Sequence, residues 1–411
     1  MLAKLKNTYL QFGYNFPLLI AFFLPFGINY AVFILLWLIG FFLFEDLNVS
    51  FKRILNNKWS YVILAFFFLH AIGFLFSQNK SDALTAIEIK LCFLAFPILI
   101  FGTKYTEIQV RKIIITFVSG CFLACMFCLF RAFYLYLFED FNAFFYSEFT
   151  YFMHPSYFAM YLIFAMLIVM LFYPKWLTQI SNLYIKIGFL TIIFLICIFL
   201  CSSKMGLITA LLLLPATLFI ILFRNGYKKL ILGLSACLVL GIFASYKLFP
   251  RPFDRIKVAF SVTSSIETID KTDAESTAVR ILIWKESIKL IKEHVLLGVT
   301  PGDVNDQLCK AYTDNGLTGA LRKRLNAHNQ FLQTFLGTGI IGFMILLIMT
   351  VFAMVFGFIK KNYILGLFSA LMVFNFLVES MLQAQAGFVF FVFFLCFILA
   401  YDFSKNGKSV S

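Results

Sequence analysis

Long apolar runs, separated by short polar turns, fill most of this chain. Hydrophobic residues make up 62% of its 411 residues and charged residues 13%, and a water-soluble domain could not hydrate its surface with that balance. A helix needs roughly 20 apolar residues to cross a bilayer, so the runs predict an all-α polytopic membrane protein with about 12 transmembrane helices. These helices are expected over residues 15–27, 29–45, 59–77, 83–102, 112–138, 156–173, 184–201, 204–223, 230–249, 329–358, 362–379 and 385–402.

One long polar segment interrupts the apolar runs. Residues 250–327 lie between the ninth and tenth predicted helices, and a loop of this length in a compact protein usually carries function. The sequence therefore predicts four parts: transmembrane helices one to nine over residues 1–249, a partly helical loop domain over 250–327, helices ten to twelve over 328–403, and a tail over 404–411.

Positive charge is shared unevenly between the loops. The net charge of +14 could indicate nucleic-acid binding, but the basic residues lie in short loops between apolar runs, where membrane topology explains them. With the N-terminus inside, the short outer loops contain little basic charge beyond Lys80 and Lys204. The positive-inside rule thus predicts that both termini face the cytoplasm and that residues 250–327 face outward.

Ionisable residues recur near the outer ends of the predicted helices. Placing ionisable residues in a membrane costs free energy, so the position of each one requires an explanation. Taken singly, each is explained by local pairing or by snorkelling to the interface. Taken together, they indicate a polar cavity that opens to the outer side. The residues are His70, Glu88, Lys90, Arg131, Glu148, His154, Lys204, His328 and Glu379.

The sequence lacks a pattern typical of metal ligands. Most cysteines lie inside predicted helices, and no Cys-x-x-Cys or Cys/His pair has the spacing of a metal site. Asp303 and Asp306 share a loop, where two spaced aspartates are usually solvated. No metal and no other cofactor is expected.

The long loop contains one predicted helix, over residues 276–298. Apolar residues recur there at steps of three or four, which predicts a buried face formed by Ile281, Trp284, Ile288, Ile291 and Val295. Arg280 precedes Trp284 by one turn and is expected on or near that face. The arginine could serve as a salt-bridge partner, as a snorkelling residue or as a clamp for an anionic ligand.

Three glycines follow a histidine at the start of the tenth predicted helix. Gly337, Gly339 and Gly342 come shortly after His328 in the stretch AHNQFLQTFLGTGIIG. Glycines in a membrane helix mostly allow close helix packing. Close packing here would fix the helix that carries His328.

Several of these segments resemble those of the bacterial O-antigen ligase and O-antigen polymerase family of membrane glycosyltransferases. His328-Asn329 followed by Gly339-x-x-Gly342 is similar to the family's ligase signature. The loop segment with Arg280-x-x-x-Trp284 and the glycine turn near residue 298 is similar to another family motif. Weaker similarities are Ser202-Ser203-Lys204-Met205-Gly206, His154-Pro155-Ser156-Tyr157 and Glu379-Ser380. Lys204 departs from the family, which usually has arginine there, and a lysine cannot bind a diphosphate bidentately.

The resemblance implies a transferase in the bacterial inner membrane. Such an enzyme moves a glycan from undecaprenyl diphosphate to an acceptor hydroxyl, here lipid A–core, on the periplasmic side. His328 is the expected general base, because a neutral imidazole is available near neutral pH. Direct displacement without a metal then inverts the anomeric centre. The expected substrate-binding residues are Arg280 and Lys204 on the leaving diphosphate, Lys90 and Arg131 in support, and His154, Asn329 and Glu379.

Two other functions are compatible with the sequence. An O-antigen polymerase or a protein O-oligosaccharyltransferase of the same family shares the donor chemistry and differs in the acceptor. A lipid-linked glycan flippase or other transporter belongs to a different class, and it requires charges along a path through both leaflets. The concentration of charges on the outer side favours an enzyme.

Overall fold

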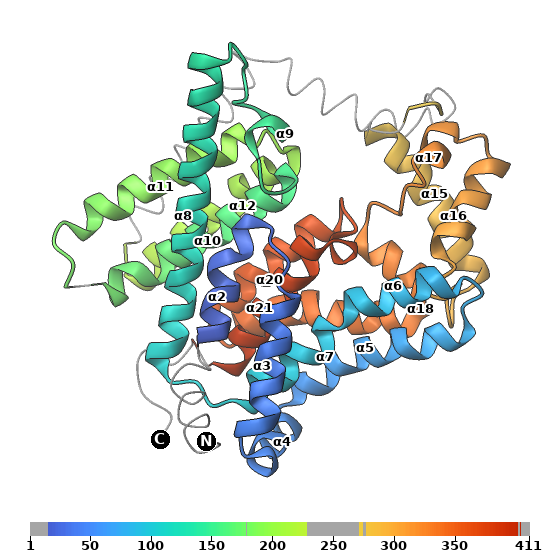
Figure 1. The fold of residues 1–411 in the computed structure, drawn as a ribbon, viewed down its shortest axis with the longest axis horizontal. Helices are drawn as coiled ribbons and strands as arrows, with labels where there is room; N and C mark the ends of the chain where they lie inside the picture. The colour runs from blue at the N-terminus through green and yellow to red at the C-terminus, as the bar shows by residue number, and fades with distance from the viewer. Residues whose placement is uncertain (1–14, 178, 228–270, 274–276, 402, 404–411) are drawn as a thin grey trace.

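The computed structural model describes residues 15–177, 179–227, 271–273, 277–401 and 403 (Figure 1). Within these residues the chain forms helices and no strand. The predicted helix over 230–249, the first part of the predicted loop domain and the tail over 404–411 lie outside the described residues.

The helices follow the apolar runs closely. Their bounds are α2 Asn15–Phe23, η1 Leu24–Phe26, α3 Ala31–Phe44, α4 Leu47–Asn56, α5 Lys58–Phe76, α6 Lys80–Lys90, α7 Cys92–Phe96, η2 Pro97–Phe101, α8 Glu107–Phe138, α9 Tyr146–Phe149, α10 Pro155–Trp176, α11 Leu183–Leu200 and α12 Lys204–Arg224. After the undescribed segment follow α15 Thr277–Glu293, α16 Val304–Asp314, α17 Thr318–Arg322, α18 Gln330–Leu347, η5 Ile348–Phe352, α19 Ala353–Ile359, α20 Tyr363–Phe376, η6 Met381–Gln383 and α21 Gln385–Ala400.

Seven helical units in the described part are long and apolar enough to cross a membrane, which confirms the predicted class of all-α membrane protein. They are α5, α6 through η2, α8, α10, α11, α12, and α18 through α19. An eighth results if α3 and α4, which meet at a bend of 115°, form one span. The count of twelve stays a prediction, because residues 230–249 are not described and three further apolar helices are shorter.

The helices α10, α20 and α21 meet at the centre of the bundle (Figure 1). Aromatic side chains fill the space between them. Phe164 of α10 lies 4.8 Å, between ring centroids, from Phe394 of α21 and 4.9 Å from Phe368 of α20. Phe117 of α8 lies 4.7 Å from Phe394. Edge-on contacts of this kind add to the energy of burial. This packing supports the segment between α20 and α21, which contains Glu379.

A second core joins α15, α16 and α17 to α18 (Figure 1). Ile283 of α15 and Leu308 and Tyr312 of α16 are completely buried, and Leu336 of α18 packs with them. The loop helices are therefore attached to the helix that follows His328.

Asp303 attaches the loop helices to the turn between α5 and α6. Its carboxylate accepts hydrogen bonds from the backbone N–H groups of Gln78 and Asn79, at 2.8–3.1 Å, and from the Thr300 hydroxyl. Asp306 accepts from Asn79 Nδ2 and pairs with Arg324 at 2.8 Å. The expectation that Asp303 is solvated was wrong, since the residue is buried and fully bonded.

The predicted buried face over residues 276–298 was only partly right, because Ile291 is buried and Trp284 packs against the same core. Ile288 and Val295 are exposed, whereas Val279, Ile283 and Ser287 are buried. Because α15 packs against both α16 and α18, the face that it buries differs from its most apolar face. Ser287 can be buried there because its hydroxyl donates a hydrogen bond to Ile283 O. Arg280 still lies at the edge of the packed surface, half-buried.

Candidate functional site

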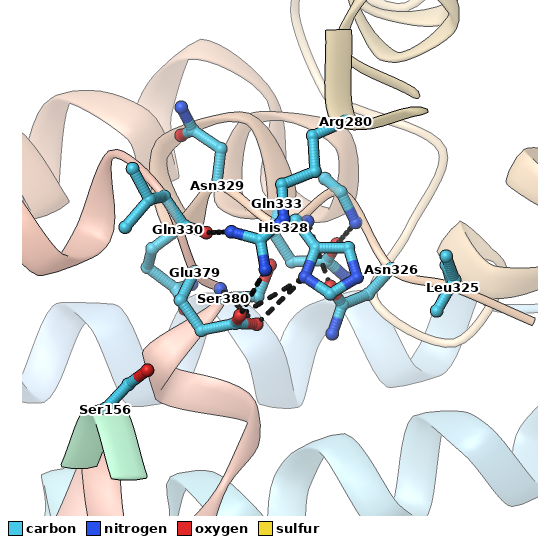
Figure 2. A network of polar contacts seen from close by, with 12 residues as sticks. Ser156, Arg280, Leu325, Asn326, His328, Asn329, Gln330, Gln333, Glu379 and Ser380 are labelled. Carbon is cyan, nitrogen blue, oxygen red and sulfur yellow. Dashed lines mark hydrogen bonds and ion pairs between the residues drawn. The ribbon is translucent and has the colours of Figure 1, made fainter. Parts of the chain in front are cut away.

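His328 lies immediately before α18 and faces Glu379 (Figure 2). Its Nδ1 is 3.2 Å from each carboxylate oxygen of Glu379. The backbone φ of His328 is 45°, in the left-handed region that side-chain-bearing residues rarely adopt. Its N–H donates to Asn326 Oδ1 at 2.9 Å, and Asn329 caps α18 by accepting from Phe331 N and Leu332 N. The local sequence Asn326-Ala327-His328-Asn329 thus holds the imidazole in place.

Glu379 lies in the turn between α20 and η6, and other parts of the chain hold this turn. Asn329 Nδ2 donates to Leu377 O at 3.0 Å, and Arg280 Nη1 donates to Val378 O at 2.6 Å. Gln330 Oε1 accepts from Leu382 N, and Lys90 Nζ donates to Leu382 O, both at 2.7 Å. Residues far apart in sequence thereby fix the carboxylate opposite the histidine.

Arg280 of α15 completes the cluster, with Nη2 3.6 Å from Glu379 Oε2 (Figure 2). Its side chain is 33% exposed. Nη1 donates to the Val378 carbonyl at 2.6 Å, which is shorter than the distance from Nη2 to Glu379. The salt-bridge interpretation of this residue is therefore confirmed. A guanidinium that remains partly exposed can still bind an anion.

The carboxyl group of Glu379 is kept ionised. Burial alone would raise its pKa, but the hydrogen bond from His328 and the charges of His328 and Arg280 lower the pKa below its ordinary value. An ionised carboxylate only accepts hydrogen bonds, so His328 presents a protonated Nδ1 to it. In the neutral ring this leaves Nε2 as the atom that can take a proton, the arrangement used by histidine bases in catalysis.

His154 lies just before α10 and within electrostatic range of the cluster. Its Nδ1 accepts from Ser156 N at 3.4 Å. Burial lowers the pKa of His154; the charge of Glu379 opposes this change, and the charge of Arg280 adds to it. The Ser203 hydroxyl, in the turn before α12, donates to the Ser156 hydroxyl at 3.2 Å, so that this turn is connected to the start of α10.

Lys204 and Arg131, both predicted to bind the diphosphate, do not contact the cluster. Lys204 is the first residue of α12 and is exposed, and its ammonium makes no hydrogen bond or ion pair with another described residue. Arg131 of α8 donates to Glu148 O at 2.7 Å and lies over the Tyr151 ring at 5.1 Å. Lys90 is buried and joins the cluster only through Leu382.

Of the three glycines after His328, Gly339 allows a close backbone contact, and its partner is the loop after α15 instead of a second helix. Gly339 has a φ of 64° and breaks α18, and a β-carbon there would lie 2.2 Å from Leu296 O. Gly298 makes an equally close approach to Leu336 O, while Val299 N donates to that carbonyl at 2.7 Å. The loop after α15 therefore binds into the break of α18 and fixes the helix that carries His328.

Asn326 and Gln330 belong to the site, although sequence reasoning missed them. Asn326 positions His328, and Gln330 positions the turn that carries Glu379. Both residues lie within two positions of His328 in the sequence, and this proximity could have indicated that they belong to the site. In the described ranges, no three His, Cys, Asp or Glu residues come together in a way that could hold a metal ion.

Residues 189–347 match the family model described as O-antigen ligase. These residues, less than half of the chain, are similar to an O-antigen ligase domain. This match confirms the family resemblance seen in the motifs. No curated protein matches the chain. The matched segment includes Lys204, Arg280, His328 and Asn329, whereas Glu379 and the other predicted site residues lie outside it.

Proposed function

We propose that this protein is a membrane glycosyltransferase that moves a glycan from undecaprenyl diphosphate to a hydroxyl of lipid A–core. The carboxylate of Glu379, which contacts both His328 and Arg280 at the start of α18, carries this proposal. The enzyme lies in the bacterial inner membrane with both termini in the cytoplasm, and its site faces the periplasm.

The cluster supplies a base for the acceptor. His328 Nε2 takes the proton from the acceptor hydroxyl, and Glu379 stabilises the imidazolium that forms. The hydroxyl oxygen attacks the anomeric carbon of the glycan. The bond from that carbon to the diphosphate oxygen breaks, and its electron pair leaves with the lipid diphosphate.

Cations stabilise the leaving group. Arg280 keeps part of its guanidinium exposed beside Glu379, and the Lys204 ammonium has no partner among the described residues. A diphosphate needs such charges as its own negative charge develops, and fixed charges are most effective in a site that excludes water. His154 and Asn329 contribute by positioning groups around this centre, whereas Arg131 is bonded to Glu148 O and lies over the Tyr151 ring.

A reconstituted transfer assay tests the proposal. Purified protein receives an undecaprenyl-diphosphate oligosaccharide with one of three acceptors: lipid A–core, a second lipid-linked glycan, or a protein with accessible serine and threonine. Glycosylated lipid A–core is the expected product. A longer lipid-linked glycan would indicate a polymerase, and glycosylated protein an O-oligosaccharyltransferase.

Transport of the lipid-linked glycan across the bilayer is the alternative function from a different class. Proteoliposomes with donor on one side only show whether the protein moves the intact lipid-linked glycan across the bilayer. The aromatic centre formed by α10, α20 and α21 argues against a charged path there. Movement of the donor without any transfer to the three acceptors would overturn the proposal.

A further inference from the structure

A cavity of about 300 Å³ lies beside the catalytic segment, between α5, α6, α16 and α18. Its wall includes Asn326 and Gln330, which stand two residues to either side of His328. Asn326 accepts from the His328 N–H, so one side chain both holds the proposed base and lines the cavity. A group bound there would lie next to the reacting centre.

The wall of this cavity is rich in carboxamides. They come from Asn305, Asn326, Gln330, Gln333 and Gln383. Asn326 and Gln333 use their side-chain oxygens on the backbone N–H groups of His328 and Ala327, which leaves their NH₂ groups without a partner among the described residues. Carboxamides donate and accept, and so match the hydroxyl groups of a sugar ring.

Lys90 gives a second, independent indication of a ligand. The residue is 2% exposed and lines the cavity, and among the described residues its ammonium donates only to Leu382 O. An ammonium has three donors, and a buried charge with too few partners costs free energy. Ligand oxygens in the cavity would supply the missing acceptors.

A carboxylate on the same wall argues against a diphosphate in this cavity. Asp82 lines it and accepts from Asn305 Nδ2 at 3.4 Å. Arg324, also in the wall, is already paired with Asp306. The lining therefore combines carboxamides with the Lys90 ammonium, the Asp82 carboxylate, the paired Arg324 guanidinium and the His70 imidazole. This mixture of donors and acceptors suits a ligand with many hydroxyls.

We propose that this cavity is a subsite for one sugar ring of the glycan substrate, with Lys90 and the carboxamides bonding to its hydroxyls. The inference rests on the proposed function and assigns Lys90 to the sugar instead of the diphosphate. The ring belongs either to the donor glycan or to the acceptor glycan.

Filling the cavity tests the proposal. Ala86 of α6 lines it, and Ala86→Phe places a ring in the space. Leu84→Phe adds the same ring at an exposed position of α6 outside the cavity and is the matched control. We expect Ala86→Phe to raise KM by about tenfold or more for one substrate, since a lost tenfold in binding follows from about 1.4 kcal/mol. A change for the donor alone assigns the ring to the donor, and a change for the acceptor alone assigns it to the acceptor.

A binding measurement separates this inference from the proposed function. Saturation-transfer NMR follows the oligosaccharide released from the donor, and separately the free core oligosaccharide, on the purified protein. If the wild type binds one of them and Ala86→Phe does not, the subsite stands even when no transfer is detected. Unchanged KM values together with unchanged binding in Ala86→Phe overturn it. Thr85→Phe, on the same wall, replaces Ala86→Phe if that variant does not fold.

Discussion

The His328 cluster and the Lys204 turn are both segments that resemble family motifs, yet the structure treats them differently. His328 and Arg280 both contact Glu379. The Asn326 side chain accepts from the His328 N–H, and Asn329 Nδ2 donates to Leu377 O, two residues before Glu379. Lys204 is exposed, and its ammonium has no partner among the described residues. The difference separates groups that are already positioned by the fold from an exposed cation, for which we propose the substrate as partner.

The largest effect is expected at the centre of the cluster. His328→Ala should lower the transfer rate by roughly 10²- to 10⁴-fold, the usual contribution of a general base. His294→Ala, an exposed histidine at the end of α15, is the matched control and should transfer normally. Rates are measured on purified variants with equal unfolding temperatures. Near-normal transfer by His328→Ala would exclude the residue as the base.

A smaller loss is expected at Arg280. Arg280→Ala should lower the rate by roughly 10²-fold, comparable to removal of one group that stabilises the charged transition state. Arg280→Lys keeps the charge and should retain more activity. Equal residual rates in the two variants would instead show that the arginine matters for packing against Val378 and Glu379.

Glu379→Gln should lower the rate roughly tenfold or more, because an amide can hold the wrong tautomer of His328. It should also change acid stability. The folded state lowers the pKa of Glu379, so its stabilisation is complete above the ordinary carboxyl pKa and is lost as the pH falls through the lowered value. The unfolding temperature of the wild type should therefore fall more steeply on acidification than that of Glu379→Gln. Parallel curves would mean that the carboxylate is not held as described.

The smallest effect is expected at the Lys204 turn. Lys204→Ala should cost about fivefold or less, since an exposed charge contributes little. Lys204→Arg should transfer as well as the wild type or better, because a guanidinium can bind a diphosphate bidentately. An inactive Lys204→Arg enzyme with a normal unfolding temperature would show that this turn does not correspond to the family motif.

The sequence predicted the long apolar helices because most apolar runs have the length that a bilayer requires, although three runs form helices shorter than that. The orientation of α15 was predicted only in part, because contacts with α16 and α18 outweigh the apolar stripe. Asp303 shows the same limit. Nothing near it in sequence indicates that the backbone of Gln78 and Asn79 will cover its carboxylate.

Individual site residues could be predicted from the sequence, but the contacts between them could not. His328, Arg280 and Glu379 stood out as polar groups near predicted helix ends, but 98 residues separate Arg280 from the Val378 carbonyl that it bonds. Local signals do not encode such long-range pairs. The carboxamide-lined cavity was missed for the same reason, since its wall is assembled from α5, α6, α16 and α18.

The anomeric configuration of the product tests the central claim most directly. If the acceptor hydroxyl, deprotonated by His328, displaces the diphosphate in one step, the new glycosidic bond has the configuration opposite to that of the donor. NMR of the glycan joined to its acceptor by the purified enzyme measures this. We predict inversion, and a product that retains the donor configuration would contradict direct displacement at the His328–Glu379–Arg280 cluster.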